Sequence, residues 1–168
     1  LNAGSNAITQ NDIIRASDLL ISGAGLVTLT GENFINTVAA SGVAGFNLTN
    51  AQALTVGSVS GTNGISSSDD VVLTADDLTL SQDITASGSD LTLQTLTAGT
   101  AINIGSVTAA TDDFDLDTAE LARLTDGFSS ITLGSSDAGK MTLAATTFND
   151  TLALISGADG IELTGALD

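Results

Sequence analysis

Short runs in which two apolar residues flank a third residue recur between residues 70 and 104. They include residues 71–73 (VVL), 78–80 (LTL), 91–93 (LTL) and 102–104 (INI). Because successive side chains of a strand point to opposite faces, the outer residues of each run would face a core and the middle one solvent. The intervening stretches (ADD, SGSD, AGT) favour turns over helices. Strands this short are not stable alone, so the pattern predicts many strands stacked in register, as in a parallel β-solenoid.

The composition fits a core that is long and narrow. Hydrophobic residues make up 42% of the chain, but it has five Phe and no Trp or Tyr to fill a thick core. Pro is absent and Gly occurs 18 times, so Gly, Asn, Asp and Ser must make the turns. We expect one all-β solenoid domain over residues 1–168. At roughly 20 residues per turn it would have about eight turns, and at ~4.8 Å per turn a length of about 40 Å.

One segment has a helical pattern. Residues 118–125 contain good helix formers, with Leu121 and Leu124 three positions apart. Asp117 or Thr118 is suited to cap the N-terminus, and Gly127 is suited to a left-handed residue at the C-terminal end. We predict a short helix of about two turns near residues 118–125 that packs on one flank of the strands.

The charge of the chain excludes several partners. There are 20 acidic residues, three basic ones and no His, for a net charge of −17. Nucleic acids and anionic membranes are bound by clustered Lys and Arg, so we expect no nucleic-acid partner. The chain has no Cys, which removes disulfides and thiolate metal sites. No apolar run approaches the ~20 residues that cross a bilayer, so we expect a chain that does not span a membrane.

The sequence repeats parts of itself. Residues 20–31 (LISGAGLVTLTG) return as residues 154–165 (LISGADGIELTG). Joining Asp168 to Leu1 would create Leu-Asp-Leu, which matches residues 114–116 (FDL). These echoes predict one period of a longer array, or a fibre subunit, that associates with itself head to tail. The expected interface residues near the junction are Leu1, Leu19, Ile161, Leu163 and Leu167.

Two segments resemble a known family. Residues 120–134 (ELARLTDGFSSITLG), and residues 26–31 followed by 38–42, are similar to segments of giant filamentous-haemagglutinin-like proteins of bacteria. The resemblance implies a right-handed parallel β-helix shaft, exported to the cell surface and used in adhesion, biofilm or fibre formation. Nothing here resembles that family's N-terminal secretion domain. The resemblance therefore implies a structural shaft in the extracellular space, with host or surface glycans contacted through other parts of the full protein.

Clustered carboxylates are the candidate metal ligands. Oxygen ligands from Asp112, Asp113, Asp115 and Asp117 could hold calcium, as could the pairs at 69–70 and 76–77. We favour solvated turns on an acidic surface instead, because the regular Gly-Asp nonapeptide of calcium-binding β-rolls is absent. No other cofactor is expected. The alternative function is a ligand-binding solenoid, for calcium, polysaccharide or ice, without catalysis.

Catalysis is not expected. A pair of carboxylates could cleave glycosidic bonds, but such a site typically also needs aromatic rings or cations to hold the sugar. There is no His to act as a general base. Lys140 could form an amide crosslink, although a solubilising charge explains it as well. Outward Thr could order water, yet the outward residue varies along the chain, and the fit of Thr to a pleated surface accounts for it. Asn repeated at turns could instead stack along the coil.

Overall fold

A computed structural model describes residues 1–105 and 113–167. The predicted all-β class is confirmed, with parallel strands in a curled sheet and one short helix. The strands are β1 (Ile8–Thr9), β2 (Arg15–Ala24), β3 (Val27–Val43), β4 (Phe46–Asn50), β5 (Leu54–Val56), β6 (Ser58–Val59), β7 (Thr62–Asn63), β8 (Ile65–Ser67), β9 (Val71–Thr74), β10 (Leu78–Leu80), β11 (Ile84–Thr85), β12 (Asp90–Gln94), β13 (Ile102–Ile104), β14 (Phe114–Leu116), β15 (Ser130–Gly134), β16 (Met141–Leu143), β17 (Leu152–Ile155) and β18 (Ile161–Leu163). The helix is α1 (Thr118–Leu121).

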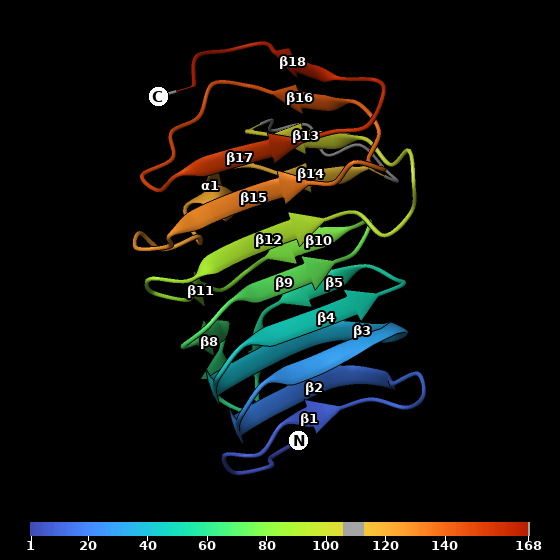
Figure 1. Ribbon diagram of the computed structural model, residues 1–168, viewed down its shortest axis with the longest axis vertical. Helices are drawn as coiled ribbons and strands as arrows, with labels where there is room; N and C mark the ends of the chain where they lie inside the picture. Colours follow the sequence, from blue (N-terminus) through green and yellow to red (C-terminus); the bar gives the residue numbers. More distant parts are fainter. Residues whose placement is uncertain (106–112, 168) are drawn as a thin grey trace.

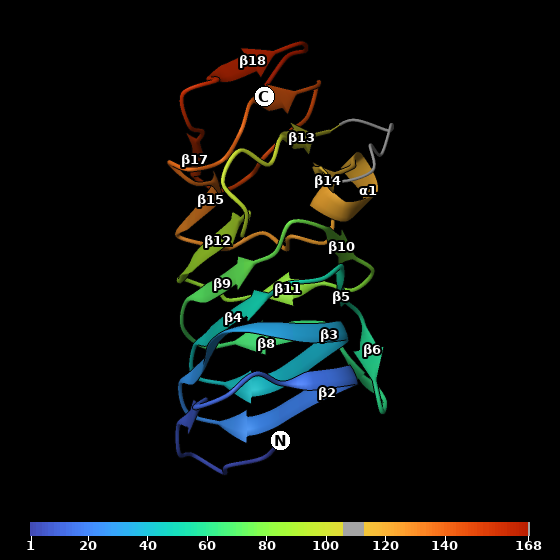
Figure 2. The same ribbon diagram turned by 90° about the vertical axis from the view of Figure 1, so that its right-hand side faces the viewer.

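The strands lie one above another along the long axis of the molecule (Figure 1). One side is formed by β1, the start of β3, β4, β9, β12, β15 and β17, all paired in parallel. Figure 2 shows the opposite side, with β5, β10, β14 and β13 at successive heights. Hydrogen bonds between neighbouring layers join residues about one turn apart in sequence, such as Asp70 and Asp90, 20 positions apart. Each layer therefore provides the hydrogen-bonding template for the next.

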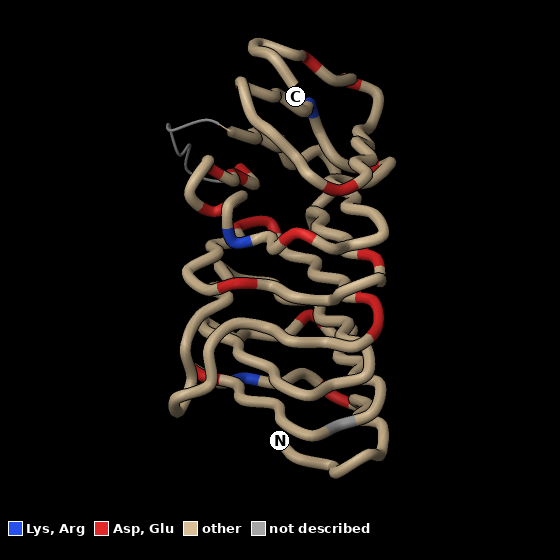
Figure 3. Tube along the Cα trace, turned by 90° about the vertical axis from the view of Figure 1, so that its left-hand side faces the viewer, with Lys and Arg blue, Asp and Glu red and all other residues tan. Residues whose placement is uncertain are grey.

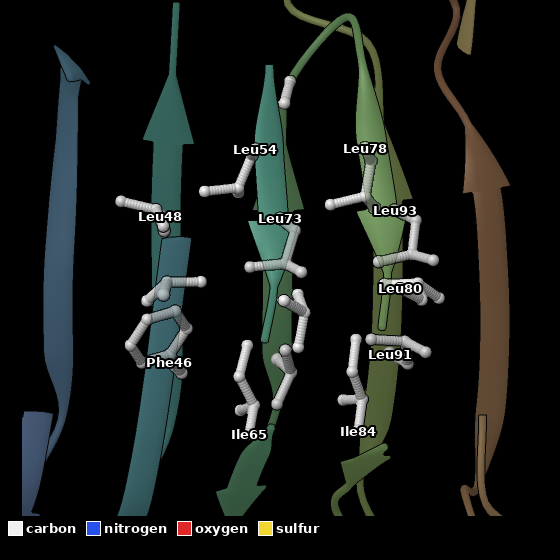
Figure 4. Packing of buried hydrophobic residues seen from close by; sticks show 14 of the residues in the cluster. Phe46, Leu48, Leu54, Ile65, Leu73, Leu78, Leu80, Ile84, Leu91 and Leu93 are labelled. Carbon is white, nitrogen blue, oxygen red and sulfur yellow. The ribbon is translucent and has the colours of Figure 1, made fainter. Parts of the chain in front are cut away.

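The apolar residues of each run face inward, as their spacing predicts. Leu91 and Leu93 of β12 are fully buried, and Thr92 between them is partly exposed. In register, Leu91 pairs with Val71 below and Ile131 above, so like residues form columns along the axis. Figure 4 shows Leu91, Leu93 and other buried apolar side chains packed between the strands of the two sides. The buried residues form a continuous, largely aliphatic core from β2 to β16.

The order of the strands in the stack departs from their order in the chain between β12 and β15. The second sheet has the order β14-β13-β16-β18, so β14 lies below β13 although it comes later in the chain. Register partners on the first side are then two turns apart in sequence: Ser130 bonds to Asp90, 40 positions earlier. Another departure is the antiparallel β6–β7 pair, whose turn residues Ser60 and Gly61 have positive φ angles of 51° and 84°. The sequence pattern predicts neither feature.

The predicted helix is present at its expected start but is shorter than two turns. The Asp117 side chain accepts hydrogen bonds from the Ala119 and Glu120 backbone N–H groups, and the Glu120 side chain accepts one from Asp117 N, which completes a capping box. The helix ends at Leu121, with Ala122 as its C-cap, because the chain then leaves to pair Leu124 with Ile84 of β11. Gly127 does have a positive φ of 118°, but it lies beyond the helix end.

Glu120 also fixes the helix to the strands. Its Oε1 atom accepts a hydrogen bond of 3.0 Å from the backbone N–H of Leu80 in β10. Leu121, the buried residue of α1, packs into the core. The predicted covering of one flank by this segment is therefore confirmed, through one carboxylate and one leucine.

Two asparagines occupy the corner where the chain turns between the two sides. Asn33 and Asn50 are fully buried and are register partners in adjacent layers. The Asn50 side chain accepts a hydrogen bond from Ile35 N and donates to Ile35 O, both at 2.9 Å. Asn33 donates to Thr49 O of the layer above at 3.0 Å. These amides satisfy backbone groups that the corner leaves without strand partners.

Replacing Asn50 with alanine tests this role. We expect Asn50→Ala to lower the free energy of unfolding by about 2 kcal/mol, because both backbone polar groups of Ile35 lose their partner in a dry interior. The matched control is Asn47→Ala, on the outer face of the same strand, with an expected change of about 0.5 kcal/mol or less. Urea denaturation followed by circular dichroism measures both. Equal losses in the two variants would contradict the role given to the buried amide.

Candidate assembly surface and acidic sites

Strand β18 presents an unfinished layer at one end of the molecule. Ile161 and Leu163 continue the inward columns of Met141 and Leu143 in the strand below, with which they pair. Met141 and Leu143 are 0% and 1% exposed, whereas Ile161 and Leu163 are 43% and 58% exposed. The difference arises because, within the described residues, no strand pairs with the far edge of β18. A further layer would bury these side chains as those of β14, β13 and β16 are buried in the same sheet.

The two copies of the repeated segment differ in the burial of their corresponding apolar residues. Residues 20–31 form the end of β2, a turn and the start of β3, and residues 154–165 form the end of β17, a turn and β18. Val27 and Leu29 of the first copy correspond to Ile161 and Leu163 of the second. The first pair is buried and the second exposed, because β3 has β1 on one edge and β4 on the other. The same local motif is therefore core or surface according to whether it is covered.

The opposite end carries Leu1, which is 56% exposed. The Leu1 backbone lies against β2, since Ser22 N donates a 3.0 Å hydrogen bond to Leu1 O. Leu167, another predicted interface residue, forms an isolated parallel β-bridge with Thr146, and 41% of it is exposed. The two ends lie at opposite poles of the long axis (Figure 1).

Leu19 is the one residue of the predicted interface set that is buried in the single chain. It is 7% exposed and belongs to the core, where β2 pairs it with Val38 of β3. Leu19 alternates inward with Ile21, so its side chain points to the interior and not to the end of the molecule. Four of the five predicted interface residues are thus exposed apolar side chains: Leu1, Ile161, Leu163 and Leu167.

The basic side chains are already engaged. Lys140 Nζ lies 2.5 Å from Glu162 Oε2 on β18, with both side chains about half exposed. Arg123 lies 3.3 Å from Asp83, and the Arg15 guanidinium lies 4.0 Å from the centre of the Phe34 ring. In Figure 3 most of the charged positions marked along the chain trace are acidic. Lys140, suggested as a crosslinking residue, therefore neutralises an acid on the end strand.

The predicted calcium ligands do not act as one group. Asp113 and Asp115 both accept hydrogen bonds from Asn103 Nδ2, at 3.3 and 2.7 Å. Asp117 instead caps α1. Asp112 lies outside the described residues. Over residues 1–105 and 113–167 no group of three or more acidic side chains is arranged to hold a metal ion, and calcium binding remains a prediction.

Some of the acidic residues have a structural function that the sequence pattern does not reveal. Asp76 Oδ1 accepts hydrogen bonds of 2.8 Å from the backbone N–H groups of Leu96 and Thr97, about one turn later. Its Oδ2 accepts a 2.6 Å bond from the Thr97 hydroxyl. Asp70 likewise accepts from Asp90 N at 2.9 Å. These carboxylates fasten the loops of adjacent layers, and a period of about 20 residues is the signal that could have paired them.

The outward column on the first side is mixed. Thr28, Asn47, Val72, Thr92 and Thr132 occupy successive layers in register. Their variety matches the expectation that the outward residue varies along the chain.

No protein-family model, curated protein or solved structure matches this chain. Among the described residues, no helix has the length and apolar character needed to cross a bilayer.

Asp76 and its neighbour Asp77 provide a matched test of loop fastening. We expect Asp76→Ala to lower the free energy of unfolding by about 2 kcal/mol, since it removes charge-assisted hydrogen bonds to the next layer. Asp77→Ala removes the same charge from an exposed side chain and should change stability by about 0.5 kcal/mol or less. Chemical denaturation of both variants measures the difference. If Asp77→Ala were the more destabilising variant, the assignment would be wrong.

Proposed function

We propose that this chain is a shaft module of an extracellular bacterial filament or large adhesin, and that modules join end to end as a right-handed parallel β-helix. The observation that carries the proposal is the exposure of Ile161 and Leu163 in columns that are buried in the layers below. A following module would pair with the free edge of β18 and cover both side chains. Edge pairing of this kind combines backbone hydrogen bonds with apolar burial.

The layered parallel pairing supports a mechanical role. Backbone hydrogen bonds run along the long axis from layer to layer, and the aliphatic core is continuous beside them. A rod built in this way resists bending and unfolding because each layer is held by its neighbours. The net charge of −17 keeps such rods apart laterally. The resemblance to filamentous-haemagglutinin-like segments supports the same role, with contacts to host or surface glycans made by other parts of the full protein.

The self-association of the 168-residue chain tests the non-covalent form of the proposal. We expect sedimentation to show concentration-dependent growth, and Leu163→Lys to weaken association at least about tenfold by placing a charge in a desolvated contact. Thr92→Lys adds the same charge to the outer face in the middle of the molecule and should leave association unchanged. Equal effects of the two variants would contradict end-to-end stacking.

A tandem of two copies, with Asp168 joined to Leu1, tests the covalent form. In the first copy, the amides of residues 161–163 should exchange with solvent at least about tenfold more slowly than in the single chain, because the second copy pairs with them. The amides of β12 provide the internal reference. A single chain that stays monomeric, together with unchanged exchange in the tandem, would refute the proposal in both forms.

A further inference from the structure

A hollow of about 580 Å³ lies between the segment that follows α1 and residues 145–150. Its apolar lining is formed by Leu121, Leu124, Ile131 and Phe148. Leu121 and Ile131 belong to the buried core, and Leu124 and Phe148 pack against that core while remaining partly accessible. This volume is within the range of sites that hold small molecules. Thr146 of the lining pairs with Leu167, but Leu1, Ile161, Leu163 and Leu167 do not themselves line the hollow.

The charged groups of the lining are two carboxylates, which lie among neutral polar residues such as Thr125 and Asn149. Asp126 and Asp150 both line it. The Asp150 carboxylate is held in place by the backbone N–H of Gly127, at 3.0 Å to Oδ1 and 3.3 Å to Oδ2. The Asp126 side chain is exposed at the rim. The hollow therefore has one positioned and one accessible negative charge beside an apolar wall.

No basic side chain lines the hollow to balance these charges. Within the described part of the chain, Arg123 is paired with Asp83 and Lys140 with Glu162, and Arg15 lies over Phe34. An anionic ligand would be repelled both by the lining and by the net charge of −17. A neutral apolar ligand would leave the carboxylates unused. A hard metal ion would in turn make no use of the apolar wall.

We propose that this hollow binds a small alkylammonium compound. The ammonium group lies between the carboxylates of Asp126 and Asp150, and the alkyl chain lies against Leu121 and Leu124. The ring of Phe148 adds attraction to the cation if it faces the ammonium, and apolar contact otherwise. The negative potential of the whole chain raises the local concentration of cations. The shaft module would thereby carry a site for organic amines on its flank.

Titration with n-hexylammonium, followed by amide chemical shifts of the whole chain, tests the proposal. We expect saturable shifts centred on Gly127, Phe148 and Asp150. Hexanoate should cause no saturable shift, and 1-hexanol, which has a similar apolar part and no charge, should bind at least about tenfold more weakly.

The variants Asp126→Asn and Asp150→Asn should each weaken hexylammonium binding about tenfold, the loss expected for one charge-assisted contact. Asparagine at position 150 keeps an oxygen that can accept from Gly127, so the loop is retained. Asp18→Asn, at an exposed position of β2, removes the same charge away from the hollow and should leave the affinity unchanged.

Several outcomes would overturn the assignment. A non-saturable response, or an equal loss of affinity in Asp18→Asn, would mean that amines only populate the ion atmosphere of an acidic protein. Equal binding of 1-hexanol would mean an apolar hollow without selectivity for charge. Displacement of hexylammonium by millimolar calcium at these same amides, with calcium bound more tightly, would mean a metal site.

Discussion

In-register parallel pairing of very short strands is the constraint on which the rest of the structure depends. A three-residue strand such as β13 buries only two side chains, Ile102 and Ile104. It is stable because the layers above and below supply both hydrogen-bond partners and apolar neighbours. The core is therefore a set of columns along the axis. The layer of β18, which has no strand on its far edge among the described residues, exposes the residues that would otherwise be its core.

The corners and loops between the strands require polar side chains. Asn33 and Asn50 satisfy the backbone where the chain turns from one side to the other. Asp76 joins the loop after β9 to the loop after β12. In a chain with so few cations, the acidic residues are used mainly as acceptors of backbone and hydroxyl hydrogen bonds. This use explains how some of the paired carboxylates contribute to the fold without any ligand.

The alternation of apolar and polar residues was enough to predict the class of the fold and the inward faces of strands such as β12. It could not predict that β14 lies below β13, because Phe114–Leu116 and Ile102–Ile104 have the same pattern and either would fit either layer. The sequence does not predict that Asp76 accepts hydrogen bonds from the loop at Leu96 and Thr97, because the two loops come close only when the layers stack. Leu19 is buried although β2 pairs only with β3 among the strands, and its sequence context does not distinguish a buried from an exposed side chain in such a terminal strand.

The exposed columns of β18 connect the fold to the proposed filament. Their burial by a following layer is the central claim, and electron cryo-microscopy of the associated protein tests it most directly. The account predicts strands spaced by ~4.8 Å along the filament axis, continuing without a break from β18 of one module into the first strands of the next. Filaments in which modules meet through their flanks, with Ile161 and Leu163 still open to solvent, would contradict it.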